Sequence, residues 1–395
     1  MREGYKKTEI GVIPLDWDVV KLHSLCDFIS VGIATSTSKH CVAEGIPLIR
    51  NQNILENKFN LDDLLYISNE FDEENKNKRI KEKDILIVRT GYPGISAVVQ
   101  KEMIGWQTFT TLIVRPKHTI IYAEYLSYFI NSHIGKKIIN GLQAGGAQKN
   151  LNVTSINKLL VIIPPLTQQK KIAQILSTAD EKIETIALQI EKAEMVKKGL
   201  MQRLLNDESG YETVTLKDVA TLNKKKYIPI ESENINYIGL EHINQKLGTI
   251  NGIGNSNDTL SQKSYFKKGE ILFGKLRPYL RKFYLANIDG VCSTEILVIQ
   301  AKENILNTFL FQIIQTESFI EHSVSKVFGT KMPRTSWNIL QEFKMVLPPL
   351  KEQTQIANIL STADEKLEVL RAKKEKYEEL KVGLMQKLLT GEVRV

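Results

Sequence analysis

Cysteine is scarce in this chain of 395 residues, which contains only Cys26, Cys41 and Cys292. The three lie far apart, with no C-x-x-C pair and no histidine cluster beside them. This spacing argues against a disulfide framework and against a structural zinc site. We expect three reduced thiols, mostly buried, because free cysteine behaves as a small apolar residue.

Long apolar runs are missing as well. No segment reaches the roughly eighteen uncharged apolar residues that a membrane span needs. The N-terminus, MREGYKKTEIGVIP, contains no apolar run of the signal-peptide type. We therefore expect a cytoplasmic protein without a membrane-spanning segment.

The sequence also lacks the motifs of nucleotide chemistry. No G-x-G-x-x-G follows a predicted strand, and no G-x-x-x-x-G-K-[ST] occurs. An adenine methyltransferase needs Asp or Asn before a Pro-Pro pair and an aromatic after it, so that the flipped base is held and stacked. Here both Pro-Pro pairs, at 164–165 and 348–349, have aliphatic neighbours, and the six histidines are scattered. We expect no catalytic site and no metal site.

The chain has the composition of a globular protein and an excess of basic over acidic residues. Its 42% hydrophobic and 25% charged residues are typical of folded proteins, and its length predicts two or three domains. The net charge of +8 and the pI near 9.0 favour a polyanionic partner, although the signal is modest for a chain of this size.

An internal repeat organises the sequence. Residues 163–208 and 347–392 align without a gap at an offset of 184. Of the 46 aligned positions, 26 are identical, including the unbroken block ILSTADEK. Two long similar segments indicate a duplicated unit with pseudo-twofold geometry.

Each copy of the repeat predicts a long helix. Apolar residues recur at alternating steps of three and four, as in the seam of a left-handed coiled coil. The Pro-Pro pairs suit the entry of a helix, and Gly391 suits the end of the second one. The seam residues that we expect to pair the helices are Leu176, Ile183, Ile186, Ile190 and Leu200 in the first copy, and Leu360, Leu367, Leu370 and Leu384 in the second.

Three lysines, Lys197, Lys374 and Lys381, interrupt this seam. Such residues weaken a seam but can fix its register, and a long lysine stem can also carry the charge out to solvent. About 40 helical residues span roughly 60 Å. Since neither helix can bury its apolar stripe alone, we expect the two to pair antiparallel, with one globular region at each end.

The globular regions are loosely related to each other. In each, a charged turn leads into a short apolar strand that ends in a basic residue, Arg89 or Lys275. A second strand-like segment and one helical segment follow. In chain order, the related segments are 80–90 with 266–276, 108–116 with 293–301, and 123–142 with 307–327. Short strands with one helix per region predict an α+β fold.

This order resembles the specificity subunit of type I restriction–modification enzymes. The resemblance rests on PPL-x-x-Q-x-x-I at the start of each long helix and GLMQ-x-LL near its end, and it extends over essentially the whole chain. It implies two target recognition domains, each reading one half of a bipartite DNA site, with the paired helices as a ruler. The implied segments are 1–162 (first target recognition domain), 163–206 (first spacer helix), 207–346 (second target recognition domain) and 347–392 (second spacer helix).

The resemblance also implies the partners. These are double-stranded DNA, two modification (methyltransferase) subunits docked on the helices, and restriction (endonuclease and translocase) subunits. S-adenosylmethionine and the methylated adenine would belong to the modification subunits, and ATP and the nuclease to the restriction subunits. This chain is then expected to be non-catalytic and to hold no cofactor.

Candidate DNA contacts are loop residues, because DNA binding needs Lys and Arg for phosphates and Arg, Lys, Asn or Gln for base edges. Two loops at the same point of the repeat, RTGYPG (89–94) and KLRPYLRKFY (275–284), combine basic and aromatic residues. Two further loops, 141–150 and 327–336, precede the long helices. From these four loops we select Arg89, Thr90, Tyr92, Gln148, Lys149, Lys275, Arg277, Tyr279, Arg281, Lys282, Lys331 and Arg334.

A third set of candidates for reading bases lies at a related place in each region. It consists of Arg50, Gln52 and Asn53 in the first region and Glu241, His242 and Asn244 in the second. For every one of these loops the alternative is an ordinary solvated connection between secondary-structure elements.

A coiled-coil scaffold whose globular regions bind proteins stays open as an alternative to DNA recognition. A steep loss of duplex affinity with salt would separate the two, since phosphate contacts release counterions. A complete fused restriction–methylation enzyme is disfavoured by the chain length and by the missing motifs.

Overall fold

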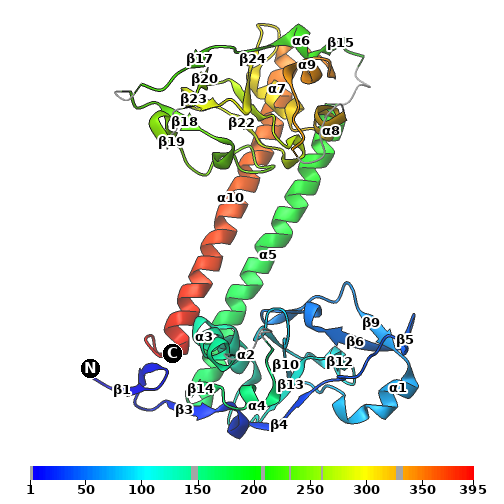
Figure 1. The fold of residues 1–395 in the computed structure, drawn as a ribbon, viewed down its shortest axis with the longest axis vertical. Helices are drawn as coiled ribbons and strands as arrows, with labels where there is room; N and C mark the ends of the chain where they lie inside the picture. The colour runs from blue at the N-terminus through cyan, green and yellow to red at the C-terminus, as the bar shows by residue number, and fades with distance from the viewer. Residues whose placement is uncertain (1–2, 144–149, 206–209, 231–232, 259–260, 326–331) are drawn as a thin grey trace. The chain divides into compact units, whose positions relative to one another are not determined.

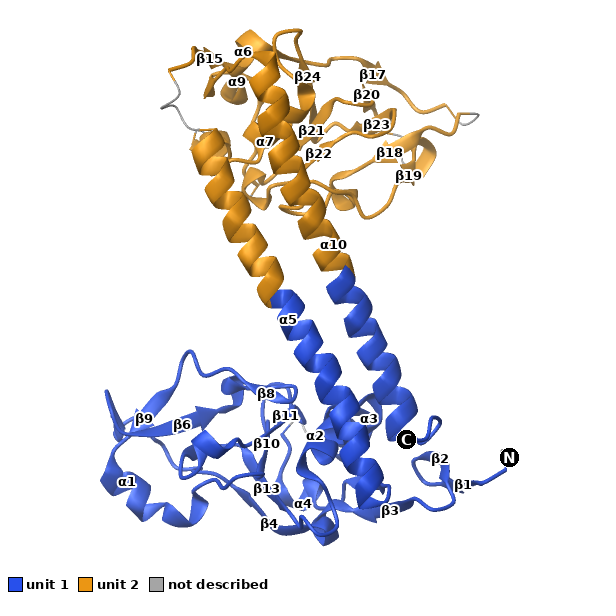
Figure 2. Cartoon of the chain, turned by 180° about the vertical axis from the view of Figure 1, so that it is seen from behind, with its two compact units in different colours: residues 1–187, 373–395 blue, residues 188–372 orange. Residues whose placement is uncertain are grey.

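The computed structural model describes residues 3–143, 150–205, 210–230, 233–258, 261–325 and 332–395. The chain forms two compact units: unit 1 is residues 1–187 with 373–395, and unit 2 is residues 188–372 (Figure 2). Each unit combines one globular part with half of each long helix. The units divide the chain differently from the four segments expected above, because both long helices are shared between them.

The described part of unit 1 contains two four-stranded sheets (Figure 1). The first is antiparallel, with the order β11-β10-β13-β4, and the second has the order β12-β6-β9-β5, with β12 parallel to β6. Their strands are β4 (Cys26–Val31), β5 (Cys41–Val42), β6 (Ile46–Arg50), β9 (Leu65–Ile67), β10 (Ile85–Ile87), β11 (Ser96–Val98), β12 (Gln107–Phe109) and β13 (Leu112–Pro116). The single strand predicted at 108–116 is wrong, because Thr110, with φ 53°, separates β12 from β13.

Smaller strand pairs complete unit 1. They are β1 (Tyr5–Thr8) with β2 (Gly11–Pro14), β3 (Asp18–Lys21) with β14 (Leu160–Ile163), and β7 (Ile54–Leu55) with β8 (Lys58–Phe59). The pair of β3 and β14 lies directly before the first long helix, and β14 ends at Ile163, immediately before Pro164.

Unit 2 repeats the arrangement of unit 1. Its sheet β16-β24-β21-β22 has the strand order of β4-β13-β10-β11, and in its sheet β17-β20-β23-β18-β19 the strands β18 and β23 are parallel, like β6 and β12. The strands are β15 (Thr213–Thr215), β16 (Ala220–Leu222), β17 (Lys226–Tyr227), β18 (Asn236–Ile238), β19 (Gly254–Asn255), β20 (Lys263–Phe266), β21 (Ile271–Gly274), β22 (Phe283–Leu285), β23 (Gly290–Ser293), β24 (Ile296–Ala301) and β25 (Lys344–Val346). The predicted duplicated α+β fold is confirmed.

The helical segment predicted in each globular part is broken into two helices. These are α2 (Ala123–Asn131) and α3 (His133–Leu142) in unit 1, and α7 (Asn307–Ile314) and α8 (Glu317–Ser325) in unit 2. At the first break the backbone of Ser132 is extended, and its hydroxyl accepts a hydrogen bond from the N–H of Gly135 at 3.1 Å, which starts α3. Thr316 caps α8 in the same way, accepting from the N–H of Phe319 at 3.3 Å. The prediction of one helix per region was therefore wrong.

Four single-turn or two-turn helices connect these elements: α1 (Asn69–Glu74), α4 (Val153–Ile156), α6 (Leu216–Val219) and α9 (Trp337–Leu340), counted over the described ranges.

The long helices are α5 (Leu166–Leu204) and α10 (Leu350–Leu389), and they lie side by side within each unit (Figure 2). In unit 1, Asp180 of α5 pairs with Lys381 of α10 at 2.5 Å. In unit 2, Lys197 of α5 pairs with Asp364 of α10. The partner on α10 comes earlier in the chain as α5 advances, so the predicted antiparallel pairing is confirmed. Neither of these helices, nor any other in the described part of the chain, has an apolar stretch long enough to cross a membrane.

The residues predicted for the helical seam are shielded from solvent. Leu176, Ile186, Leu360 and Leu367 are buried, and the others are half-buried: Ile183, Ile190, Leu200, Leu370 and Leu384. In unit 1 the core joins Leu176 of α5 with Leu388 of α10 and Phe129 of α2. The globular parts thus pack on the helices through the same apolar cores that hold their own sheets together.

A buried glutamine ties each long helix to its globular part. Gln169 of α5 accepts a hydrogen bond from the N–H of Tyr122 at 2.8 Å and donates to the carbonyls of Ile120 and Pro164 at 3.0 and 2.9 Å. Gln353 of α10, which stands 184 positions later, makes the equivalent three bonds to Leu306, Asn304 and Pro348. Both glutamines are fully buried, so the fold repeats a structural anchor that joins each globular part to its long helix.

Replacing Gln169 with Leu is expected to lower the free energy of unfolding by about 2–5 kcal/mol, because buried backbone groups lose their hydrogen-bond partners. The midpoint of a urea titration should fall accordingly. Gln189→Leu, at an exposed position of the same helix, is the matched control and should change the stability by less than about 0.5 kcal/mol. An unchanged midpoint for Gln169→Leu would mean that the amide is not an anchor.

Candidate nucleic-acid interface

Three loops of unit 1 meet around Arg89, which follows β10. The Nε of Arg89 donates to Oδ1 of Asn150 at 3.0 Å, and the N–H of Leu151 donates to the carbonyl of Arg89 at 3.0 Å. Asn51, at the end of β6, accepts from the N–H of Arg89 at 3.2 Å and donates to Oγ1 of Thr90 at 2.9 Å. The structure therefore joins the loops after β6, after β10 and before α4 into one polar surface.

The equivalent loops of unit 2 also meet. Leu276 and Arg334 form a β-bridge, which joins the loop after β21 to the segment before α9. Lys282 forms a bridge with Gln245, and its Nζ donates to the carbonyl of Leu240, which joins the same loop to the one after β18. The three-loop surface of unit 1 is thus repeated in unit 2.

Three of the predicted cations in the described part of unit 2 already have an acidic partner. Lys275 and Arg334 both pair with Glu295, at 3.9 and 3.0 Å. Arg281 pairs with Glu317. Half-exposed ion pairs of this kind are weak and can exchange one partner for another, so a phosphate can replace the carboxylate.

Arg277 differs from these cations in its backbone and in its side chain. Its φ of 51° and ψ of 62° lie in the left-handed region, which is costly for a residue other than glycine. The N–H donates to the carbonyl of Pro333 at 2.8 Å, and the carbonyl accepts from the N–H of Leu280 at 2.9 Å. The side chain is exposed, and none of the described residues pairs with its guanidinium. With Tyr279, 49% exposed in the same turn, this loop presents an unengaged arginine and an aromatic ring to solvent.

The corresponding exposed side chains of unit 1 are Thr90 and Tyr92. Tyr92 is 80% exposed and lies between Gly91 and Gly94, whose φ values are 83° and 99°. Both glycines therefore hold a conformation that other residues rarely adopt. The remaining predicted contacts, Gln148, Lys149 and Lys331, lie outside the described residues.

Three residues of the third set, Arg50, Asn53 and His242, form hydrogen bonds within their own loops. Arg50 donates to the carbonyl and the carboxylate of Asp63, at 2.6 and 2.8 Å, and Asn53 is 2% exposed and accepts from the N–H of Arg50 at 3.0 Å. His242 of unit 2 is the counterpart of Asn53, because its Nδ1 accepts a hydrogen bond from the N–H of Gly239, three residues earlier, at 3.0 Å. Asn53 cannot reach a base edge without opening its loop. The side chain that does reach the candidate surface is Asn51, which the sequence analysis missed, although it stands between two selected residues.

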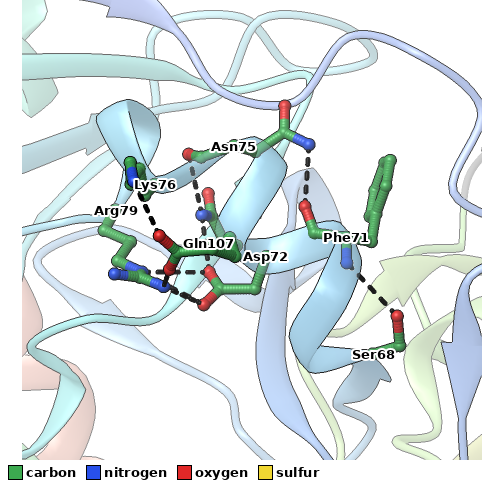
Figure 3. Close-up of polar contacts among 8 residues, drawn as sticks. Ser68, Phe71, Asp72, Asn75, Lys76, Arg79 and Gln107 are labelled. Carbon is green, nitrogen blue, oxygen red and sulfur yellow. Dashed lines mark hydrogen bonds and ion pairs between the residues drawn. The ribbon is translucent and has the colours of Figure 1, made fainter.

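A separate polar network fixes α1 to β12 in unit 1 (Figure 3). The guanidinium of Arg79 donates to both carboxylate oxygens of Asp72, the shorter distance being 2.6 Å, and to Glu73 at 2.8 Å. Gln107 of β12 donates to Asp72 at 2.8 Å and to the carbonyl of Asn75 at 3.0 Å. The two carboxylates raise the pKa of Arg79. We therefore assign Arg79 to the framework of unit 1 and not to the candidate interface.

The other titratable groups give no second candidate. In the described ranges, no three His, Cys, Asp or Glu side chains gather where they could hold a metal ion. Cys26 and Cys292 are buried, and burial raises the pKa of each thiol to about 12. Cys41 is exposed, and none of the three forms a disulfide, so the prediction of free and mostly buried thiols is confirmed.

Known proteins resemble this chain over its whole length. The family model described as "Type I restriction modification DNA specificity domain" matches residues 14–195 and again residues 208–379. The chain is 28% identical to the putative type I restriction enzyme MjaX specificity subunit and 25% identical to the MjaVIII specificity subunit, both of Methanocaldococcus jannaschii; all of this chain and 97% and 96% of those proteins are covered.

The fold agrees with this relationship. A solved S subunit of a type I restriction–modification system from M. genitalium aligns with a TM-score of 0.63 at 17% identity, covering 94% of this chain and 96% of that one. A chain from a solved type I R-M system complex aligns with a TM-score of 0.56 at 16% identity, covering 96% of this chain and 99% of that one. Because the family model matches most of the sequence in two consecutive copies, this chain belongs to the family of type I restriction–modification DNA specificity proteins.

Proposed function

We propose that this chain is the DNA-recognition subunit of a type I restriction–modification complex and that it reads a bipartite target. Each globular part reads one half-site, and the paired helices set the spacer between the half-sites. The partners are double-stranded DNA, two modification subunits and restriction subunits. The chain is non-catalytic, it holds no cofactor, and S-adenosylmethionine and ATP belong to the partner subunits. It acts in the cytoplasm.

The observation that carries this proposal is a polar surface built twice. Arg89, Asn51 and Asn150 come together from three loops of unit 1, and Arg277 lies in the equivalent three-loop cluster of unit 2. Both surfaces offer basic groups, and the surface of unit 1 adds the amides of Asn51 and Asn150; such groups contact phosphates and base edges. Two such surfaces on a duplicated framework support recognition of a target that has two half-sites.

The candidate side chains divide into two proposed roles. Exposed side chains without an acidic partner reach base edges in a groove: Thr90, Tyr92, Arg277 and Tyr279. Cations that are already hydrogen-bonded or ion-paired position the duplex through its phosphates: Arg89, Lys275, Arg281, Lys282 and Arg334. Gln148, Lys149 and Lys331 belong to the same loops and are proposed as DNA contacts from the sequence.

Genome-wide mapping of methylated adenines tests the proposal. In a host that carries this chain and its modification partner, we expect one bipartite motif with a fixed spacer. In vitro, if about six phosphates are contacted, duplex affinity should fall by roughly a thousandfold between about 50 and 200 mM salt. A flat salt response without any motif would favour a protein-binding scaffold. Methyl transfer by the purified chain alone would contradict the non-catalytic role.

A further inference from the structure

Two of the three lysines that interrupt the predicted seam point into it. The side chain of Lys197 is 13% exposed and that of Lys381 is 15% exposed. Lys374, by contrast, is 36% exposed and pairs with Glu378 of its own helix at 3.2 Å. Lys197 and Lys381 stand 184 positions apart and are therefore the same position of the repeat. Both long helices therefore have a charged side chain inside the seam at this one position of the repeat.

Each inward lysine meets an aspartate of the other long helix. The Nζ of Lys381 lies 2.5 Å from Oδ1 of Asp180, and the Nζ of Lys197 bonds to Oδ1 of Asp364. The two aspartates are also repeat-equivalent, since both belong to the block ILSTADEK. The same interhelical ion pair is therefore formed once in each unit.

The globular part of each unit reaches the same aspartate. In unit 1 the hydroxyl of Tyr128 in α2 donates to Oδ2 of Asp180 at 2.7 Å. In unit 2 the Nε2 of Gln312 in α7 donates to Oδ2 of Asp364 at 3.2 Å. Burial and the Asp180 carboxylate raise the pKa of Tyr128, so its hydroxyl stays a donor. Each aspartate thus joins three elements: its own long helix, the other long helix and one globular part.

A shielded ion pair specifies geometry better than it stabilises. Desolvation offsets much of the attraction between the charges, but a charge left in the seam without its partner is strongly destabilising. A slip of one heptad would keep apolar residues in the seam while separating Lys197 from Asp364. The pair therefore excludes registers that the apolar side chains alone would accept, as buried polar residues do in coiled coils.

We propose that Asp180 and Asp364 are positioning residues: each fixes the register of the two helices in its unit and the seating of the adjacent globular part, and together they hold the DNA spacer to one length. The statement about the spacer rests on the proposed function, whereas the register does not depend on DNA.

Charge reversal in unit 2 tests this assignment. Asp364→Lys places two cations in the seam, and the double variant Lys197→Asp with Asp364→Lys restores an ion pair of opposite polarity. Gln312 and Gln315 border this pair, and their amides can donate or accept, so the reversed pair keeps its partners. Glu378→Lys is the matched control, because it reverses a charge of the more exposed pair on the same helix.

The helix register is read by the distance between spin labels in the full chain with its modification partner. Labels on Lys192→Cys and Glu368→Cys, both exposed and within unit 2, report it in a background with the exposed Cys41 replaced by Ser. Asp364→Lys should add a second distance population that reflects an axial slip of about 10 Å, one heptad. The double variant and Glu378→Lys should keep a single population.

The spacer is read by mapping methylated adenines with the same variants. Asp364→Lys should lower methylation at sites with the native spacer by about tenfold, without changing the half-site sequences, and the double variant should restore it. If Asp364→Lys does not fold, the neutral variant Asp364→Asn is tested by the same two measurements, the spin-label distance and the map of methylated adenines.

An unchanged distance and an unchanged spacer in the folded single variant would overturn the positioning role and leave DNA recognition standing. If methylation directed by the wild-type chain showed no bipartite motif, the proposed function would be contradicted. The spin-label distances would still show whether Asp364 fixes the helix register.

Discussion

Inserting three heptads into each long helix is expected to move DNA modification to targets whose spacer is longer by about nine base pairs, with both half-sites unchanged. Twenty-one added residues lengthen a helix by about 32 Å, and the duplex rises about 3.4 Å per base pair. Nine base pairs are close to the roughly ten base pairs of one turn of the duplex. The second half-site therefore keeps nearly the same orientation about the duplex axis relative to the first. Mapping of methylated adenines measures the new spacer.

The insertions belong where the two units divide, after Ala187 in α5 and after Ala372 in α10. Whole heptads preserve the apolar seam. The ion pairs formed by Asp180 and Asp364 survive as well, because each pair lies within one unit. Lengthening both helices equally keeps these pairs aligned.

One heptad in each helix is the matched control. It adds about 10 Å, or three base pairs, which turns the second half-site by about a third of a turn. We therefore expect less modification from this variant than from the longer one. A three-heptad variant that modifies different half-site bases would contradict the role of the helices as a ruler.

The paired helices could be predicted from the sequence because their signal is periodic and occurs twice. The heptad pattern from Leu176 to Leu200 fixes which face is buried, and a second copy supplies the partner. The same reasoning pointed to Lys197 and Lys381 as exceptions in the seam. It could not identify their partners, because Asp364 and Asp180 stand outside the apolar pattern and only the antiparallel register brings them opposite the lysines.

The breaks inside the globular parts were not predictable in this way. Apolar residues continue through the segment 123–142, so its pattern indicates a single helix. The break depends on the hydroxyl of Ser132, which caps the following helix and competes with helix continuation. A serine at that place is common in helices that do not break, so the residue alone carries too little information.

The candidate DNA surface was predicted as separate loops, and its assembly was not. Arg89 and Asn150 are 61 positions apart, and Arg334 and Glu295 are 39 apart, so no local pattern links them. Sequence composition also cannot tell a cation with a carboxylate partner from one without. That distinction, which separates Arg281 from Arg277, required the fold.

Removing the side chain of Arg277 is therefore expected to have a specific effect on recognition. Arg277→Gly suits the left-handed backbone of this position, since glycine adopts φ near 51° freely, so the loop keeps its shape. If the guanidinium forms a bidentate contact with a base, duplex affinity should fall by about 1–3 kcal/mol, or roughly 5–150-fold, and one base pair of the half-site read by unit 2 should become degenerate. The other half-site should stay unchanged.

Arg281→Gly provides the matched control for this experiment, because Arg281 has nearly the same backbone conformation, with φ 54°, but its guanidinium already pairs with Glu317. We expect this control to weaken binding without changing the motif and to lower the salt slope by about one unit, as the loss of a phosphate contact does. Arg277→Lys then separates charge from geometry, since lysine keeps the charge but lacks the planar fork. Full recovery of the motif with lysine would assign Arg277 to a phosphate. A degenerate position that persists with lysine, at an unchanged salt slope, would assign it to a base.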